Sequence, residues 1–177
     1  LCDFEAVERF KANALNPHTN PVTRGGAEND DIFFAGREAQ NKHFEAVPDV
    51  VAEYMKAISE HTGREYAPFT YYGAPDAERV IVAMGSVTET AKEVIDVLVA
   101  RGEKVGLIKV HLYRPFSVKY LTAVLPETVK KIAVLDRSKE MGTREPLYLD
   151  VLHALKDKNL TIIGGRYGMG SRDTAPN

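Results

Sequence analysis

The stretch from residue 79 to residue 170 alternates short apolar segments with amphipathic ones, and this alternation most limits what the chain can fold into. The pattern predicts strands over 79–84, 105–110, 131–135 and 160–163, and helices over 88–101, 118–123 and 147–156. The strand segments are almost continuously apolar, as expected for strands that helices cover on both faces. Strand–helix–strand connections of this kind form right-handed crossovers. We therefore predict an α/β three-layer sandwich with a mainly parallel sheet.

Local signals mark the ends of these elements. Gly102 follows the first predicted helix and is typical of a helix C-terminus. Ser117 precedes the second and is a suitable N-cap. The glycine-rich run 164–170 follows the last predicted strand, and we interpret it as a tight loop.

The first 76 residues show weaker patterns. We predict a short helix within 1–16, with Asp3 as its N-cap, and then an irregular segment over 16–31. A second helix is expected within 41–62, from about residue 47 onward, with Pro48 in its first turn and Gly63 after its end. The segment 64–76 has aromatic residues beside glycine and proline, and we interpret it as a packed loop.

Composition excludes several classes of protein. Hydrophobic residues make up 44% and charged residues 27% of the 177 residues, with a formal net charge of −2. This balance is typical of a globular domain and disfavours a basic nucleic-acid binder or a polybasic membrane segment. No apolar run approaches the roughly 20 residues of a membrane span. Cys2 is the one cysteine, which fits a reducing cytoplasm, and residues 1–10 lack the layout of a signal peptide.

Ten phrases stand in an order that carries a family resemblance. They are Asn20-Pro21-Val22-Thr23-Arg24-Gly25, Gly36-Arg37-Glu38-Ala39, Ala46-Val47-Pro48, Thr62-Gly63-Arg64-Glu65-Tyr66, Tyr71-Tyr72-Gly73-Ala74-Pro75-Asp76-Ala77, Met84-Gly85-Ser86, Leu112-Tyr113-Arg114-Pro115-Phe116, Val134-Leu135-Asp136-Arg137, Glu145-Pro146-Leu147-Tyr148 and Gly164-Gly165-Arg166-Tyr167-Gly168. In this combination the chain resembles the second domain of pyruvate:ferredoxin (flavodoxin) oxidoreductase.

The resemblance implies a piece of a much longer enzyme. That enzyme decarboxylates pyruvate on thiamine diphosphate and Mg, passes electrons through 4Fe–4S clusters to ferredoxin or flavodoxin, and transfers the acetyl group to coenzyme A. It further implies an N-terminal arm over 1–47 from the end of the first, thiamine-side domain. A helix and connector over 48–76 would follow, and then a domain over 77–177 similar to the C-terminal domain of transketolases. The parent enzyme would be a homodimer.

The sequence lacks the motifs for this cofactor chemistry. A thiamine diphosphate site needs a Gly-Asp-Gly segment, which is absent, and a ferredoxin-type cluster needs several cysteines. The five histidines show no metal-ligand spacing. We therefore expect no catalytic residue, no bound cofactor and no metal on this chain alone.

Five residues are candidates for binding an anion. Gly85, Ser86 and Thr88 stand where a parallel strand ends and a helix begins, and free backbone N–H groups there can hold an anion. The alternative is that Ser86 or Thr88 only caps the helix. Arg114 and Arg137 follow two other strands and would lie at the same sheet edge. For them we favour ion pairing with neighbours such as Asp136, Glu140 or a partner domain.

Two further motifs carry smaller functional predictions. Thr23-Arg24-Gly25 lies where the chain would leave the first domain, and we favour a tether between Arg24, Glu28 and a domain surface. In the run 164–170 the glycine spacing is reversed from that of a dinucleotide fingerprint, so a tight loop is favoured over phosphate binding.

These observations predict a cytoplasmic, catalytically silent domain that supports assembly of a pyruvate:ferredoxin oxidoreductase. One alternative is the equivalent domain of another 2-oxoacid:ferredoxin oxidoreductase. A second is a stand-alone module that binds phosphate or a nucleotide through Arg114 and Arg137. A third is a purely structural interaction domain with a partner-dependent arm.

Overall fold

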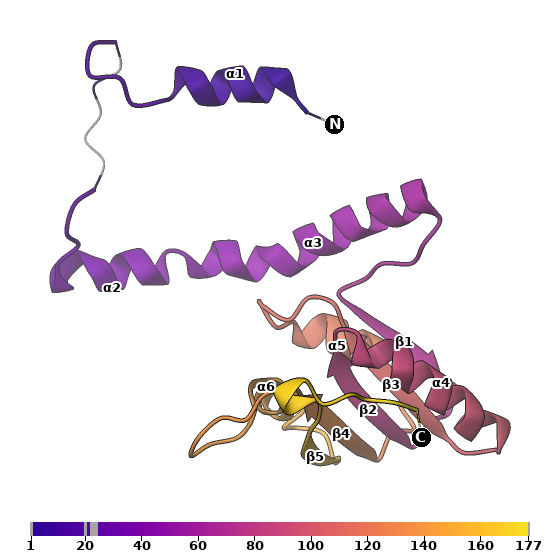
Figure 1. Cartoon of the computed structure of the whole chain (residues 1–177). Coiled ribbons are helices and arrows are strands. Elements are labelled where there is room, and N and C mark those ends of the chain that lie inside the picture. Colours follow the sequence, from indigo (N-terminus) through magenta and orange to yellow (C-terminus); the bar gives the residue numbers. More distant parts are fainter. Residues whose placement is uncertain (1, 20, 22–24, 177) are drawn as a thin grey trace. The chain divides into compact units, whose positions relative to one another are not determined.

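Figure 1 shows the computed structural model of the chain, which describes residues 2–19, 21 and 25–176. The chain divides into two compact units, Leu1–Asn41 and Lys42–Asn177. Among the described residues, no helix is both long and apolar enough to cross a membrane.

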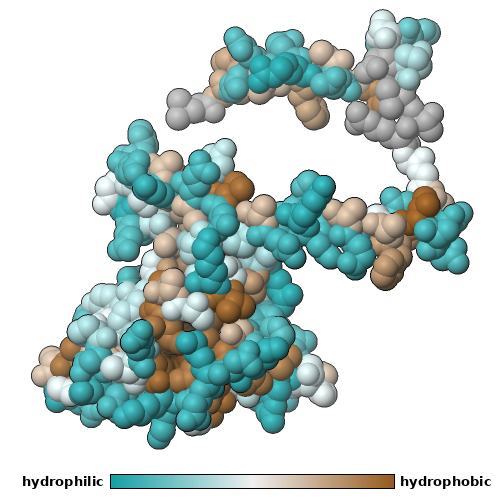
Figure 2. Space-filling view, turned by 180° about the vertical axis from the view of Figure 1, so that it is seen from behind, coloured by the Kyte–Doolittle hydropathy of each residue, from teal (hydrophilic) through white to brown (hydrophobic). Residues whose placement is uncertain are grey.

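The first unit contains the helices α1 (Phe4–Ala12) and α2 (Asp30–Glu38). Asp3 caps α1 by accepting a hydrogen bond from the Ala6 backbone N–H at 3.0 Å, which confirms the predicted N-cap. The sequence did not lead us to predict α2, although the acidic first turn at Asp30 and Asp31 favours a helix N-terminus. Neither helix has a buried residue. Apolar side chains lie exposed among hydrophilic ones along this part of the chain (Figure 2).

The second unit begins with a long helix and continues as an α/β domain. Its elements are α3 (Asn41–Thr62), β1 (Phe69–Gly73), β2 (Arg79–Met84), α4 (Val87–Ala100), β3 (Val105–Val110), α5 (Val118–Val124), β4 (Lys131–Asp136), α6 (Pro146–Ala154), β5 (Thr161–Arg166) and the 3₁₀ turn η1 (Met169–Ser171). The strand–helix alternation predicted from residue 79 onward is confirmed.

The five strands form one sheet in the order β1-β3-β2-β4-β5. All neighbours among β2 to β5 pair in parallel, which confirms the predicted parallel sheet. β1 pairs antiparallel with β3, with Phe69 opposite Val110. The loop that we predicted over 64–76 is therefore wrong between Phe69 and Gly73. Those residues are aromatic or β-branched apart from the glycine, and pairing with β3 makes them an edge strand.

Two other boundaries differ from the prediction. α3 begins at Asn41 and continues through Pro48, which costs the helix one backbone hydrogen bond without ending it. β5 continues through Gly164 and Gly165, which we had assigned to a loop, because both pair with β4. The predicted signals at Ser117 and Gly102 are confirmed. Ser117 accepts from the Tyr120 N–H, and Gly102 has a φ of 84° just after α4.

The sheet has a core on each face, and alternate strand residues point to opposite cores. On one face Val82, Ile108 and Val134 pack with residues of α5 and α6. On the other face Ala83 and Leu107 pack with residues of α4, including Ile95. Helices on both sides of a mostly parallel sheet confirm the predicted α/β class. Because β2 and β4 run parallel, their carboxyl ends lie at the same edge of the sheet.

Candidate functional site

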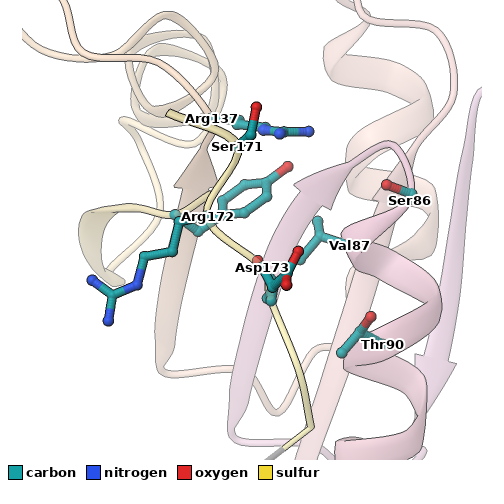
Figure 3. Close-up of a pocket in the computed structure, with 9 residues that line it drawn as sticks. Ser86, Val87, Thr90, Arg137, Ser171, Arg172 and Asp173 are labelled. Carbon is teal, nitrogen blue, oxygen red and sulfur yellow. The ribbon is translucent and has the colours of Figure 1, made fainter. Parts of the chain in front are cut away.

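A cavity of about 220 Å³ lies at the carboxyl edge of the sheet. It combines residues from the start of α4, the end of β4 and the last segment of the chain. The lining residues are Ser86, Val87, Thr90, Arg137, Tyr167, Ser171, Arg172, Asp173 and Thr174 (Figure 3). The fold therefore brings together two of the five predicted anion-binding residues, Ser86 and Arg137.

Ser86 borders this cavity because the chain turns sharply after β2. Gly85 has a φ of 79°, a conformation that glycine adopts without strain, and α4 starts two residues later. Ser86 occupies the N-cap position, but its side chain makes no capping hydrogen bond. The Thr88 side chain is buried, and its hydroxyl donates to the Gly85 carbonyl at 2.7 Å. The capping that we considered for these two residues does not form, and the Thr88 hydroxyl is already bonded within the turn.

Arg137 extends from the residue after β4, and its guanidinium group points toward the α4 side of the cavity in Figure 3. Its Nε donates to the Gly168 carbonyl at 3.0 Å, which holds the side chain against the turn after β5. Tyr167 lies beside it and donates to the Met84 carbonyl at 3.4 Å. Burial raises the pKa of Tyr167, while the nearby Arg137 charge acts in the opposite direction. Tyr167 therefore stays a neutral hydroxyl at physiological pH.

The cavity has a mixed electrostatic character. Asp173 lines it together with Arg137, so a bound anion would meet a carboxylate as well as a guanidinium group. Arg172 is also a lining residue, but Figure 3 shows its charged end directed away from the cavity. A group with one negative and one positive end fits this distribution better than a polyphosphate does.

Arg114 does not line this cavity. One of its terminal nitrogens lies 2.8 Å from a carboxylate oxygen of Asp150 on α6, and it also donates to the Tyr113 hydroxyl at 3.1 Å. We had named Asp136 and Glu140 as ion-pair partners for the two arginines, and the partner found for Arg114 is a different residue. Its positive charge is already compensated within the fold.

Two buried carboxylates have structural roles that were not predicted from the sequence. Asp136, at the end of β4, accepts hydrogen bonds from the N–H groups of Leu147 and Tyr148, each at 3.1 Å. It therefore caps α6 from a different element. Burial raises the pKa of Asp136, and the two backbone hydrogen bonds oppose that shift. A polar residue directly after an apolar strand is the sequence signal that could have indicated this role.

Glu145, the second buried carboxylate, precedes α6 and bonds Arg166 of β5. That hydrogen bond lowers the pKa of Glu145. Asp136 and Glu145 together tie the start of α6 to β4 and β5. Both side chains are thus engaged in contacts that hold the fold together.

Metal-binding geometry is absent from the described part of the chain. There, no three His, Cys, Asp or Glu side chains come close enough to hold an ion. Thr23 and Arg24, which carried a smaller functional prediction, lie outside the described residues.

Comparisons with known proteins identify the family. Residues 77–177 match the family model described as pyruvate:ferredoxin oxidoreductase core domain II. The chain is 56% identical to a pyruvate-flavodoxin oxidoreductase of Enterobacter agglomerans, over 99% of this chain and 15% of that protein. It is 52% identical to the pyruvate:ferredoxin oxidoreductase of Moorella thermoacetica, again over 99% of this chain and 15% of that protein.

Among solved structures, a 2-oxoglutarate:ferredoxin oxidoreductase from Magnetococcus marinus matches with a TM-score of 0.45 and 22% identity. The match covers 63% of this chain and 18% of that one. The chain thus spans about 15% of the length of the curated relatives that it matches. Since the family model covers more than half of the chain, the chain belongs to the pyruvate:ferredoxin oxidoreductase core domain II family.

Proposed function

We propose that this chain is an architectural part of a pyruvate:ferredoxin (flavodoxin) oxidoreductase and is catalytically silent by itself. The observation that carries the proposal is the combination of high identity to these enzymes with coverage of only 15% of their length. The parent enzyme would oxidatively decarboxylate pyruvate to acetyl-CoA and CO₂, with two electrons passed to ferredoxin or flavodoxin.

The parent would carry thiamine diphosphate, Mg and 4Fe–4S clusters, would use coenzyme A as a substrate, and would work as a cytoplasmic homodimer. The residues of this chain do not fit those cofactors. Four thiolates are required to hold such a cluster, and Cys2 is the one cysteine. The sequence also lacks Gly-Asp-Gly for the diphosphate and its metal. The proposal therefore assigns the redox chemistry to other domains of the parent.

We also propose that three segments of the chain have different roles. Residues 1–47 form an arm that ends the thiamine-side domain, residues 48–76 connect it, and residues 77–177 form the second domain. The arm helices support this division, because Phe4, Phe10 and Phe34 are all more than two-thirds exposed. Apolar side chains at helical spacing that stay exposed within the arm indicate that the arm packs on another surface.

The relatives do not favour the alternatives of another 2-oxoacid substrate or a stand-alone nucleotide module. Anion binding at the carboxyl edge stays a prediction, now centred on Ser86 and Arg137 because Arg114 is paired elsewhere. Titration with inorganic phosphate, followed by the chemical shifts of residues 85–90, would test it. Shifts that saturate and disappear in Arg137→Gln would support binding, and unchanged spectra would exclude it.

Two measurements test the main proposal. A western blot of the source cells should show a band several times larger than the 19.6 kDa of this chain. A band near 19.6 kDa would overturn the assignment to a longer enzyme. Purified 1–177, supplied with pyruvate, coenzyme A and a viologen acceptor, should reduce no acceptor above the protein-free rate. Turnover by the isolated chain would overturn the claim of catalytic silence.

A further inference from the structure

One face of the sheet is only partly covered by a helix. α4 packs on β1, β2 and β3, whereas α6 packs on β4 and β5 from the opposite face. On the α4 side, Ile163 of β5 is 59% exposed although it lies in a strand of a parallel sheet. Strands of such sheets are normally covered on both faces, so part of the helical layer beside α4 is missing from this unit.

The uncovered region is a groove of about 300 Å³ with an apolar floor. Ile81, Ala133 and Ile163 form the floor, and Ile95 and Leu98 form the wall on the α4 side. The groove lies toward the amino ends of the strands, where Arg79, Lys131 and Thr161 are aligned across β2, β4 and β5. The groove lies beside α4 and over two strands. One helix packed next to α4, at the usual 8–10 Å between helix axes, would fit there.

The carboxyl half of the same face is already covered. Tyr167 packs into the α4-side core, and the last segment of the chain passes beside Thr90 of α4 (Figure 3). The groove therefore has a closed end at the carboxyl edge and an open end at the amino edge. Neither α4 nor the C-terminal segment fills it.

Charge at the open end favours an acidic occupant. Arg79 pairs with Glu103 and is thereby compensated. Lys131 lines the groove and has no ion pair among the residues that the structure describes. An acidic side chain next to an apolar helix face would meet both the groove floor and this cation.

We propose that the groove receives a helix from polypeptide of the longer enzyme outside residues 1–177. That helix would bury an apolar face on Ile81, Ala133 and Ile163, and would place a carboxylate beside Lys131. The inference rests on the proposed function, because it requires the remaining length of the relatives, of which this chain spans 15%. The proposed docking adds to that function a specific surface, the groove beside α4, through which this domain would contact the rest of the enzyme.

A photo-crosslinking experiment on the full-length enzyme tests the occupant. Benzoylphenylalanine replaces Ile163, and in a control protein it replaces Met141, which is 85% exposed on a loop. The expected result is a crosslink from position 163 to a peptide outside residues 1–177 of the same polypeptide, with none from position 141. Crosslinks to a second copy of the enzyme, crosslinks to residues 1–41, or no crosslink would each overturn the proposal.

Hydroxyl-radical footprinting adds a readout that does not depend on the crosslinker. Most of the oxidation of the β5 peptide seen in 1–177 should be lost in the full-length enzyme, because burial removes Ile163 from solvent. Lys131→Glu should restore much of that oxidation in the full-length enzyme, and Lys158→Glu, a control at an exposed lysine, should not. Equal oxidation in the long and short chains would overturn the proposed docking helix. It would leave the assignment to a longer enzyme intact, since the western blot tests that assignment separately.

Discussion

Gly106 and Asp136 are two single residues on which the packing around the sheet depends. The Tyr71 ring lies directly over Gly106, and the Tyr71 hydroxyl donates to the Ala74 carbonyl. Asp136 is 2% exposed and holds the first turn of α6. One position therefore requires the absence of a side chain, and the other requires a buried acceptor.

Replacing Gly106 with Ala should destabilise the domain. A Cβ built at this position would lie 2.2 Å from the Tyr71 hydroxyl oxygen, so the ring would have to move. We expect a loss of about 1–3 kcal/mol, as is typical for overpacking. Urea unfolding of the variant and the wild type measures it. Gly26→Ala is the matched control, because nothing lies within 4 Å of its Cβ position. Equal midpoints for Gly106→Ala and wild type would contradict the close packing.

Replacing Asp136 with Asn should also destabilise the chain, for a different reason. An amide offers one acceptor to the two N–H groups of Leu147 and Tyr148, which leaves one of them without a partner. The expected loss is about 1–3 kcal/mol for a buried unsatisfied group. Asp157→Asn, at an exposed aspartate, is the control and should unfold like wild type. An unchanged midpoint for Asp136→Asn would rule out the capping role.

Side-chain contacts join α3 and α6 to neighbouring elements. Asp49 of α3 accepts from Tyr120 of α5 at 2.8 Å and lies 2.7 Å from the Lys119 ammonium group. Glu145, at the start of α6, pairs with Arg166 of β5. The α3 contact lies at the solvent-exposed surface, whereas the Glu145 carboxylate is buried. We therefore expect Glu145 to affect stability more.

The Glu145–Arg166 pair predicts a specific dependence of stability on pH. The pKa of Glu145 is lowered from 4.5 in the folded state, so folding favours its ionised form. The stability that this pair adds is therefore present above pH 4.5 and is lost as the pH falls through the folded pKa. The raised pKa of Asp136 acts oppositely, because its contribution falls as the pH rises above 3.8.

The difference in unfolding free energy between wild type and Glu145→Gln isolates the pair. Both proteins keep Asp136, so its titration largely cancels. We expect the difference to be constant from pH 7 to pH 5.5 and to shrink as the pH falls below 4.5. Urea unfolding at a series of pH values measures it. A difference that does not change with pH would show that Arg166 does not stabilise the Glu145 charge.

At the scale of the whole molecule, the two units differ in how they are stabilised. The α/β domain has a core on both faces of its sheet, while α1 and α2 bury no residue. A segment of that kind gains little free energy from its own packing. We expect the second unit to fold without the first.

Deleting residues 1–41 should leave the unfolding of the remainder unchanged. The midpoint of urea unfolding for 42–177 should match that of 1–177 within experimental error, because none of the described residues in 1–41 is buried. The same deletion in the full-length enzyme should impair its assembly, since the exposed apolar arm is proposed to pack on another domain. A lower midpoint for 42–177 would show that the arm stabilises the domain.

The sequence by itself determined the elements whose signals are local. The apolar run 79–84, the cap at Ser117 and the glycine at position 102 each act over a few residues, and all three were predicted correctly. The alternation of these elements was sufficient to predict a parallel sheet, because few chain paths can connect them. Family phrases along the whole chain then identified the family to which the chain belongs.

Only the tertiary structure decided which distant residues meet. Pairing with β3 turned residues 69–73 into a strand, and the strand order placed Asp136 under α6. The same strand order brought Ser86 and Arg137 to one cavity and placed Arg114 in an ion pair with Asp150. These outcomes depend on contacts between residues far apart in the chain, which local propensity does not encode. The groove beside α4 also depends on the tertiary structure, because it forms where the sheet extends beyond the helix that packs on that face.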